Sequence, residues 1–538
     1  MIGSLPSVIL QGAPLDAATL RQVLARPVQP ELGAPVLARV AAGRLVLEQA
    51  MAAGQPIYGA TTGVGAMKHT EHRDGAAIAA FNAGLALAHQ MAVGEEVAPG
   101  VVRLMLALRL NTLATGRVGV TPDFVQMLAA MLRADLLPVV QARGSVGCGD
   151  LGQMGQLAAV MVGQGMARLA GVAMPAAEAF ARAGLAPHAM QPRESLAAVG
   201  SNSFGLARSA AAVLRAGDAM RQAMGQAAVT AVAWGLDRAV WRAARHSLIP
   251  GEAAMAGWLE AALEDQRDWP QRGSVHDALS GRFLVQILAA SLTAAEGALR
   301  ALLRHTAQVD DNPVICDGQV VTSGASLLCD LSAQMAALQL AMAQLGRNIF
   351  NRCLMLSNGN LPGLTVNLVP PGVVGTGYGP LMKLAQEQAV RLNAAAAPVA
   401  PLNLTLAAGL EDEALLIPLA AERLEAQAEA LEWLLTVEAL LAGQALELRG
   451  LVPGRMVAHH MAMLRAHIPP FTGDMPLSAP LAALRECLCC AEARTELCAL
   501  APYLPFDAEM AIPQTRAGGG NLPLSSRSNE IAPRGPIQ

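Results

Sequence analysis

Residues 143–152 read Arg143-Gly144-Ser145-Val146-Gly147-Cys148-Gly149-Asp150-Leu151-Gly152, and this stretch is the most informative part of the sequence. Four glycines in ten residues predict a backbone that turns tightly or lets another group approach closely. The cysteine between Gly147 and Gly149 is either a reactive group or the precursor of one. The alternative is a small apolar residue in a tight turn, because free cysteines are commonly buried.

The composition around this loop favours long helices and a large core. Hydrophobic residues make up 53% of the 538 residues and aromatic residues only 3%, so the apolar side chains are mainly Ala, Leu, Val and Met. Ala, Leu and Met lose little side-chain entropy in a helix. The sequence therefore predicts a mainly α-helical protein, and a large subunit interface would bury the excess apolar surface.

Charge and cysteine usage exclude several classes of function. A net charge of −4 without a basic stripe argues against nucleic acid binding. Gln156, Gln164 and Arg168 interrupt the most apolar window, residues 155–174, so no membrane span is expected. The eight cysteines lack paired CxxC spacing, which predicts no metal site and buried thiols at residues 487–490. With no signal peptide at the start, a reducing cytoplasm is the simplest location.

Local patterns predict several elements. Thr121-Pro122-Asp123 is typical of a capped helix start, and that helix is expected to end near Ala134. A helix from the glycine-rich loop to about Leu169 is expected next. Asp317-Gly318, at the centre of Val314–Thr322, predicts a hairpin. Hydrophobic spacing predicts longer helical stretches over residues 205–247, 276–305, 326–356, 380–396 and 411–449.

Five segments in register resemble the aromatic amino acid ammonia-lyase family, and are most similar to its histidine ammonia-lyases. The order and spacing hold from about residue 40 to 450, which makes the set far more specific than any one segment. The segments are Tyr58-Gly59-Ala60-Thr61-Thr62-Gly63-Val64-Gly65, Arg109-Leu110-Asn111-Thr112-Leu113-Ala114-Thr115-Gly116, Gly144–Leu151, Asp311-Asn312-Pro313 and Gln444-Ala445-Leu446-Glu447-Leu448-Arg449.

The resemblance implies an ammonia-lyase/fumarase-like fold, in which a long central helical bundle carries a smaller N-terminal domain. We expect the N-terminal domain, with the Tyr58 loop and the cysteine-glycine loop, to span residues 1–200. The central and C-terminal bundle would span residues 201–510, and residues 511–538 would form a flexible tail. The resemblance also implies a homotetramer whose active sites combine residues from neighbouring subunits.

The family makes its electrophile from its own backbone and needs no external cofactor. An Ala-Ser-Gly triad cyclises and dehydrates to a methylidene-imidazolone. Counting back from Asp150-Leu151 places the triad on Gly147, Cys148 and Gly149 here. Cys148 would lose hydrogen sulfide where serine loses water, and Gly147 in place of alanine is sterically permissive. The loop is one residue shorter than the family's G-S-V-G-A-S-G-D-L.

Four further residues match functional positions of the family. Tyr58 falls on the catalytic base, although an ordinary tyrosine pKa of about 10 requires a positive or hydrogen-bonding environment. Arg282 falls on the arginine that binds the substrate carboxylate, for which a guanidinium fork is well suited. His89 and Glu411 align with positions that contact an imidazole ring in histidine lyases. Each of three residues has an alternative role. Tyr58 would be a buried tyrosine with a hydrogen-bonded hydroxyl, Arg282 would form a surface ion pair, and His89 would have a structural role.

Other positions depart from the family pattern. Leu279 replaces the second catalytic tyrosine, Ser326 replaces a phenylalanine beside the electrophile, and Leu410 replaces a glutamine. The expected asparagine falls on Gly200, although Asn202 lies two residues away and is a candidate substitute.

These residues leave three functions open. The first is elimination of ammonia from a histidine-like or aromatic L-amino acid to give an α,β-unsaturated acid, which a 2,3-aminomutase would share in its early steps. The second is a catalytically lapsed homologue that acts as a binding or assembly subunit. The third is thiol chemistry at an uncyclised Cys148 near a helix N-terminus, where the thiol pKa would fall.

Overall fold

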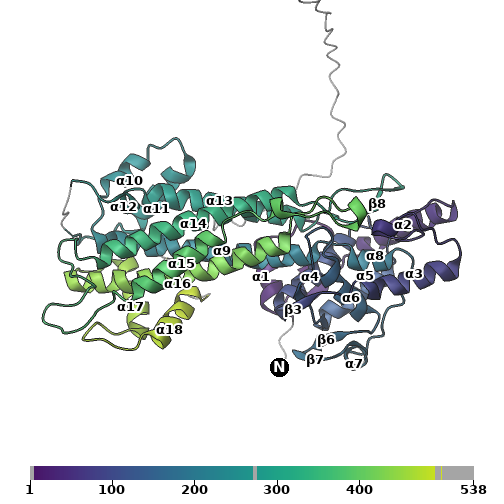
Figure 1. Ribbon diagram of the computed structural model, residues 1–538, viewed down its shortest axis with the longest axis horizontal. Helices are drawn as coiled ribbons and strands as arrows, with labels where there is room; N and C mark the ends of the chain where they lie inside the picture. Colours follow the sequence, from purple (N-terminus) through teal and green to yellow (C-terminus); the bar gives the residue numbers. More distant parts are fainter. Residues whose placement is uncertain (1–4, 271–274, 491–492, 494–498, 500–538) are drawn as a thin grey trace, which may run out of the picture.

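The chain is mainly α-helical and elongated, as Figure 1 shows. The computed structural model describes residues 5–270, 275–490, 493 and 499. The predicted tail at residues 511–538 and the end of the predicted bundle range lie outside the described residues. Short helices and most of the small sheets gather at one end of the molecule, and long helices run away from them (Figure 1).

The first 200 residues form short helices around the segments that carry the candidate site. These helices are α1 (Ala17–Ala25), α2 (Ala34–Ala52), α3 (Gly75–Ala88), α4 (Pro99–Leu113), α5 (Pro122–Arg133), α6 (Leu151–Met161), α7 (Ala176–Arg182) and α8 (Glu194–Val199), with the 3-10 turn η1 (Gly65–Met67).

The long helices pack side by side as a bundle, in which α16 lies against α9, α14 and α15. The middle of α16 is buried on every side, which suits its run of Ala, Leu and Val. The helices after residue 200 in the described ranges are α9 (Ser203–Trp234), α10 (Ala239–Ala244), α11 (Pro250–Ala262), α12 (Leu279–Arg282), α13 (Leu284–His305), α14 (Cys329–Ser357), α15 (Leu381–Ala394), η2 (Ala400–Leu402), η3 (Ala407–Gly409), α16 (Ile417–Arg449), α17 (Arg455–His467) and α18 (Ser478–Cys489).

Glycine ends the two longest helices. The 32 residues of α9 extend about 48 Å and stop where Gly235 takes a φ of +80°. Gly450, with a φ of +62°, ends α16 in the same way. The change from short to long helices falls between α8 and α9, and the division into domains at residue 200 stays a prediction.

The strands are short and pair in small sheets. β1 pairs with β2 in parallel, β3 with β5 and β8 with β9 antiparallel, and β4, β6 and β7 form a three-stranded sheet. Their bounds are β1 Ser7–Ile9, β2 Gln29–Glu31, β3 Val93–Glu96, β4 Leu137–Pro138, β5 Gln141–Arg143, β6 Met166–Leu169, β7 Val172–Pro175, β8 Val314–Cys316 and β9 Gln319–Val321.

Two local predictions are confirmed and one is wrong. Thr121 caps α5 by accepting a hydrogen bond from the Phe124 N–H, and Asp317-Gly318 forms the turn between β8 and β9. The helix predicted to reach Leu169 instead ends at Met161. The chain then turns back and pairs as β6 with β4 and β7, which buries Ala167 and Met174 but leaves Met166 and Val172 exposed.

No helix in the described ranges has the length and apolar character needed to cross a bilayer. Among the same residues, no three His, Cys, Asp or Glu side chains come together as a set of metal ligands.

Candidate active site

The candidate triad forms a tight turn directly before α6. Gly147 and Gly149 take φ values of +77° and +73°, in the left-handed region that side chains rarely adopt. A Cβ on Gly147 would lie 2.6 Å from the backbone nitrogen of Ile417, where α16 begins. Glycine is therefore required at position 147, rather than merely permissive as the sequence suggested. The backbone N–H of Leu416 donates to the Val146 carbonyl and holds the two segments together.

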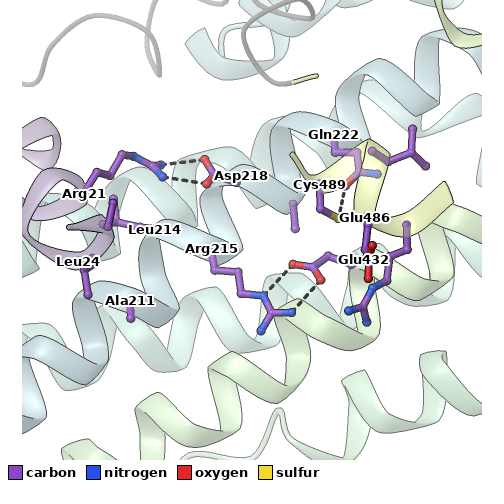
Figure 2. Close-up of a pocket in the computed structure, with 14 residues that line it drawn as sticks. Arg21, Leu24, Ala211, Leu214, Arg215, Asp218, Gln222, Glu432, Glu486 and Cys489 are labelled. Carbon is purple, nitrogen blue, oxygen red and sulfur yellow. Dashed lines mark hydrogen bonds and ion pairs between the residues drawn. The ribbon is translucent and has the colours of Figure 1, made fainter. Parts of the chain in front are cut away.

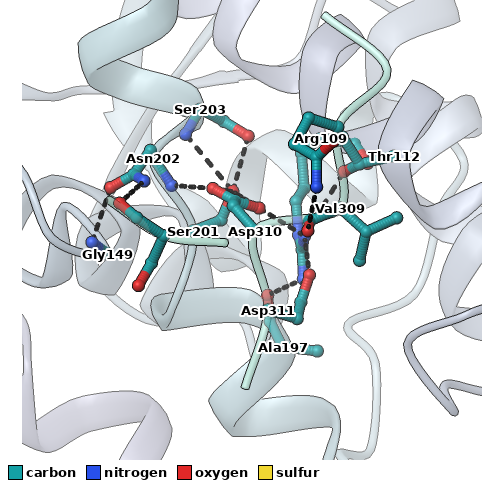
Figure 3. Close-up of polar contacts among 12 residues, drawn as sticks. Arg109, Thr112, Gly149, Ala197, Ser201, Asn202, Ser203, Val309, Asp310 and Asp311 are labelled. Carbon is teal, nitrogen blue, oxygen red and sulfur yellow. Dashed lines mark hydrogen bonds and ion pairs between the residues drawn. The ribbon is translucent and has the colours of Figure 1, made fainter. Parts of the chain in front are cut away.

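Asn202 connects the triad to the loop that follows β9. Its side-chain oxygen accepts a hydrogen bond of 2.6 Å from the backbone N–H of Gly149, and its amide donates to the Ser326 carbonyl at 2.6 Å. The Ser326 hydroxyl lies 3.6 Å from the Cys148 sulfur. Figure 3 shows the contact between Asn202 and Gly149. The structure thus places Asn202 in contact with the triad, and its substitution for the family's asparagine stays a prediction.

A buried carboxyl group, that of Asp150, holds the glycine-rich loop against the start of α9. Asp150 accepts hydrogen bonds of 2.6 Å from the Ser145 hydroxyl and from the backbone N–H of Gly205 at the start of α9. Ser145 in turn accepts from the backbone N–H of Gly147 at 2.9 Å. Burial raises the pKa of Asp150 to about 7, and the two hydrogen bonds oppose that rise. Sequence reasoning assigned no role to Ser145 or Asp150, although both stand beside Cys148 in the glycine-rich stretch.

Behind the triad, two of the sequence motifs meet in a fully buried ion cluster (Figure 3). Arg109 binds both oxygens of Asp311 at 2.8 Å, and Arg193 donates to the same carboxylate at 3.1 Å. The neighbouring Asp310 accepts from the backbone N–H of Asn202. Burial, and next the charge of Asp311, raise the pKa of Asp310 to about 6. The cluster fixes the segment around Asn202 against α4.

Tyr58, Glu411 and Cys148 lie within electrostatic range of one another, because Glu411 raises the pKa of both Tyr58 and Cys148, and Cys148 raises that of Tyr58. Tyr58 and Glu411 meet at Gly65, where an added Cβ would lie 4.0 Å from the Glu411 Oε1. The Tyr58 oxygen accepts a hydrogen bond of 2.8 Å from the Gly65 N–H. Burial is the main cause that raises the pKa of Tyr58, and Glu411 and Cys148 raise it further, against Gly65 and Arg193. Within one chain, the surroundings of Tyr58 therefore disfavour its deprotonated, phenolate form.

His89 caps the C-terminal end of α3, and its ring nitrogen Nδ1 lies 3.4 Å from the Leu85 carbonyl. Its own carbonyl lies against Gly155 of α6, where a Cβ would approach to 2.2 Å. The structure thus places His89 at the junction of α3 with the helix that follows the triad. A contact of its ring with substrate stays a prediction.

A separate pocket lies away from the triad, between α1, α9, α16 and α18 (Figure 2). It has a volume of about 660 Å³, and four of its charged lining residues pair with one another. Arg21 binds Asp218 at 2.8 Å, and Arg215 binds Glu432 at 2.7 Å. None of the predicted site residues lines this pocket.

Comparisons with known proteins identify the family of the chain. A sequence model described as aromatic amino acid lyase matches residues 15–466. The chain belongs to the aromatic amino acid lyase family. It is 31% identical over 504 residues to a histidine ammonia-lyase of Sorangium cellulosum, with 89% of this chain and 96% of the relative covered. It is 32% identical over 473 residues to that of Deinococcus radiodurans, covering 85% and 89%.

Solved structures show the same fold. An ergothionase from Treponema denticola superposes with a TM-score of 0.85 at 23% identity, covering 91% of this chain and 99% of that one. Histidine ammonia-lyase from Trypanosoma cruzi gives 0.84 at 24% identity, covering 93% and 96%. The mainly helical ammonia-lyase fold that the sequence predicted is therefore confirmed.

In this aromatic amino acid lyase, Arg282 lies far from the triad of its own chain. Arg282 is the last residue of α12, is exposed, and has its guanidinium 5.8 Å from the Phe283 ring centroid. Figure 1 places α12 at one end of the bundle and α6, which follows Cys148, at the other. Leu279 shares α12 and is 56% exposed. The structure therefore unites Tyr58, Cys148 and Glu411 but leaves Arg282 apart.

Proposed function

We propose that this chain is a cytoplasmic ammonia-lyase that eliminates ammonia from a histidine-like or aromatic L-amino acid to give an α,β-unsaturated acid. The observation that carries the proposal is the contact of Asn202 with Gly149 in the triad, with Tyr58 and Glu411 within electrostatic range of Cys148, in a member of the aromatic amino acid lyase family. No structural requirement explains why a tyrosine and a cysteine between two glycines share one site.

The triad fits a backbone-derived methylidene-imidazolone. Ring closure joins the Gly149 nitrogen to the Gly147 carbonyl carbon, and the positive φ of both glycines bends the chain into the tight turn that this needs. Asn202 fixes the orientation of the Gly149 N–H. Cys148 carries a thiol on its Cβ, which is a competent leaving group. Once formed, the group would supply the electrophile that activates the substrate amine, without an external cofactor.

The surrounding residues would bind and deprotonate the substrate. Tyr58 takes the β-proton, and its oxygen already points into the loop that ends at Gly65. Glu411 and His89 supply polar contacts for the ring of a histidine-like substrate. Because burial and Glu411 raise the pKa of Tyr58, the base needs a further positive charge in the assembled site.

Arg282 of a second copy would provide that charge and bind the substrate carboxylate. Arg282 is exposed and distant from the triad of its own chain, and the apolar neighbours Leu279 and Phe283 are 56% and 41% exposed. Leu340 on the outer face of α14 is 65% exposed. We therefore propose a homotetramer in which sites are shared between chains.

Mixed oligomers test the shared site directly. Co-expressing Tyr58→Phe with Arg282→Ala should restore activity that neither variant shows alone, because some sites would receive both intact residues. Mixing two separately inactive Tyr58→Phe preparations is the control. A mixture with no more activity than its parts would contradict the sharing of sites.

The function itself is tested by incubating the purified protein with single L-amino acids, beginning with histidine, and measuring ammonia release and new ultraviolet absorbance. Histidine, tyrosine or phenylalanine should release ammonia, and the Tyr58→Phe variant should release it about 10²–10⁴-fold more slowly. Release of a β-amino acid would identify an aminomutase. No reaction with any amino acid would favour the lapsed homologue that serves as a binding or assembly subunit.

A further inference from the structure

Ser326 lies next to the leaving group of the proposed electrophile. Its hydroxyl is 3.6 Å from the Cys148 sulfur, within hydrogen-bonding distance for sulfur. The family pattern has serine at the reactive position and phenylalanine at the position of Ser326. Here both positions differ, and the two new side chains touch each other.

Ser326 is held in place from two sides. Its carbonyl accepts a hydrogen bond of 2.6 Å from the Asn202 amide, and Asn202 also accepts from the Gly149 N–H. The preceding turn is fixed by Asn312, which accepts from the Ser323 N–H at 3.0 Å. Cys148, Gly149, Asn202 and Ser326 therefore form a closed ring of contacts, in which the hydroxyl is aimed at the sulfur by its backbone.

The other groups around Cys148 oppose negative charge on sulfur. Burial is the main cause that raises the pKa of the thiol, and Glu411, Asp150 and Asp310 raise it further. The Ser326 hydroxyl opposes them, because a hydrogen bond donated to sulfur stabilises the charged form. Of these four side chains, Ser326 is the one that favours a departing sulfur anion.

We propose that Ser326 assists formation of the electrophile by holding the Cys148 sulfur and donating a hydrogen bond to it as the Cβ–S bond breaks. This rests on the proposed function, because it concerns how the same site matures. The proposal gives Ser326 a catalytic role in maturation, whereas the sequence showed only that Ser326 replaces a phenylalanine of the family pattern.

The reaction is balanced without an oxidant. The Gly149 nitrogen bonds to the Gly147 carbonyl carbon, and that oxygen leaves as water with the protons of the Gly149 and Cys148 amides. The Cα proton of Cys148 then passes to solvent, and its electron pair forms the Cα–Cβ double bond. The Cβ–S pair leaves with sulfur as hydrosulfide, which takes a proton from solvent and departs as hydrogen sulfide.

The test compares the wild type with Ser326→Ala, Ser326→Thr and the matched control Ser323→Ala. Ser323 stands in the same loop, and its hydroxyl accepts from the Ala325 N–H. The readouts are hydrogen sulfide trapped during maturation and the fraction of Cys148 peptide that has lost hydrogen sulfide and water. Thermal unfolding checks that each variant folds.

We expect Ser326→Ala to mature about tenfold to a hundredfold more slowly, the usual effect of losing one hydrogen bond to a charged group. Ser326→Thr and Ser323→Ala should mature like the wild type. Equal rates for Ser326→Ala and wild type, or equal slowing by Ser323→Ala, would overturn the role of Ser326 alone. A wild type with an intact, alkylatable Cys148 would overturn the proposed electrophile as well.

Discussion

Asn202 accepts a hydrogen bond of 2.6 Å from the backbone N–H of Gly149, and this bond joins the residue before α9 to the nitrogen that must close the proposed ring. Asn202 is 1% exposed, and its own backbone N–H donates to Asp310. The segment that begins α9 therefore helps to hold the triad, through a side chain two residues after the position of the family's asparagine.

Asn202→Ala should slow maturation of the triad by about tenfold or more, because the buried Gly149 N–H would lose its acceptor at a cost of about 1–3 kcal/mol. The fraction of cyclised Cys148 peptide, followed by mass spectrometry, measures this. Asn393→Ala is the matched control, because Asn393 bonds to the Ala389 carbonyl of its own helix. Equal maturation of the two variants would show that Asn202 is dispensable.

Restoring the family's alanine by Gly147→Ala should harm the protein. Its Cβ would lie 2.6 Å from the Ile417 nitrogen, and the left-handed backbone alone costs a side chain about 1–2 kcal/mol. Gly450→Ala is the control, because Gly450 has a φ of +62° and an added Cβ there would meet nothing within 4 Å. The temperature of thermal unfolding should fall further for Gly147→Ala, and a smaller loss would contradict the close approach to α16.

The activity should rise with pH on the alkaline side. A base acts in its ionised form, and burial raises the pKa of Tyr58 above its ordinary 10.0, so ionisation increases as pH rises. Tyr58→Phe should lower kcat by about 10²–10⁴-fold and abolish the alkaline rise. Tyr378→Phe is the control, because Tyr378 lies before α15 and packs against Phe471, which is no candidate site residue. The pH profile of kcat/KM decides, and an unchanged profile in Tyr58→Phe would exclude the tyrosine as base.

The bundle contains a fully buried ion pair whose disruption should destabilise the fold. Arg352 binds both oxygens of Glu438 at 2.6 and 2.8 Å, and both side chains have no exposed area. Arg352→Ala would leave a buried carboxylate unpaired, at a cost of about 3–5 kcal/mol. Denaturant unfolding at one protein concentration measures the loss. The exposed pair Arg391–Glu387 provides the control, since Arg391→Ala should change stability little.

Local patterns predicted the elements whose signals are local. The cap at Thr121 and the Asp317-Gly318 turn are read from neighbouring residues and were found where expected. The prediction of a helix that reaches Leu169 was wrong. Gly163 and Gly165 take φ values of +80° and +74°, and the chain turns there into a sheet with distant partners. Pairing between distant segments leaves no mark in local hydrophobic spacing.

The residues of the candidate site also divide into those that the sequence predicted and those that it did not. Motif resemblance selected Tyr58, Cys148 and Glu411, and the structure brings these together. Asp150 and Asp310 are buried carboxyl groups whose importance depends on what surrounds them, and a single sequence does not show burial. Arg193 was not recognised either, because its partner Asp311 lies 118 residues away.

The central claim is most directly tested by the accurate mass of the peptide that contains Cys148, taken from the purified, unalkylated protein. A formed electrophile predicts a peptide lighter than its sequence by one hydrogen sulfide and one water, together with extra ultraviolet absorbance in the intact protein. A peptide of unaltered mass, with Cys148 fully reactive toward iodoacetamide, would contradict the electrophile and the lyase mechanism built on it.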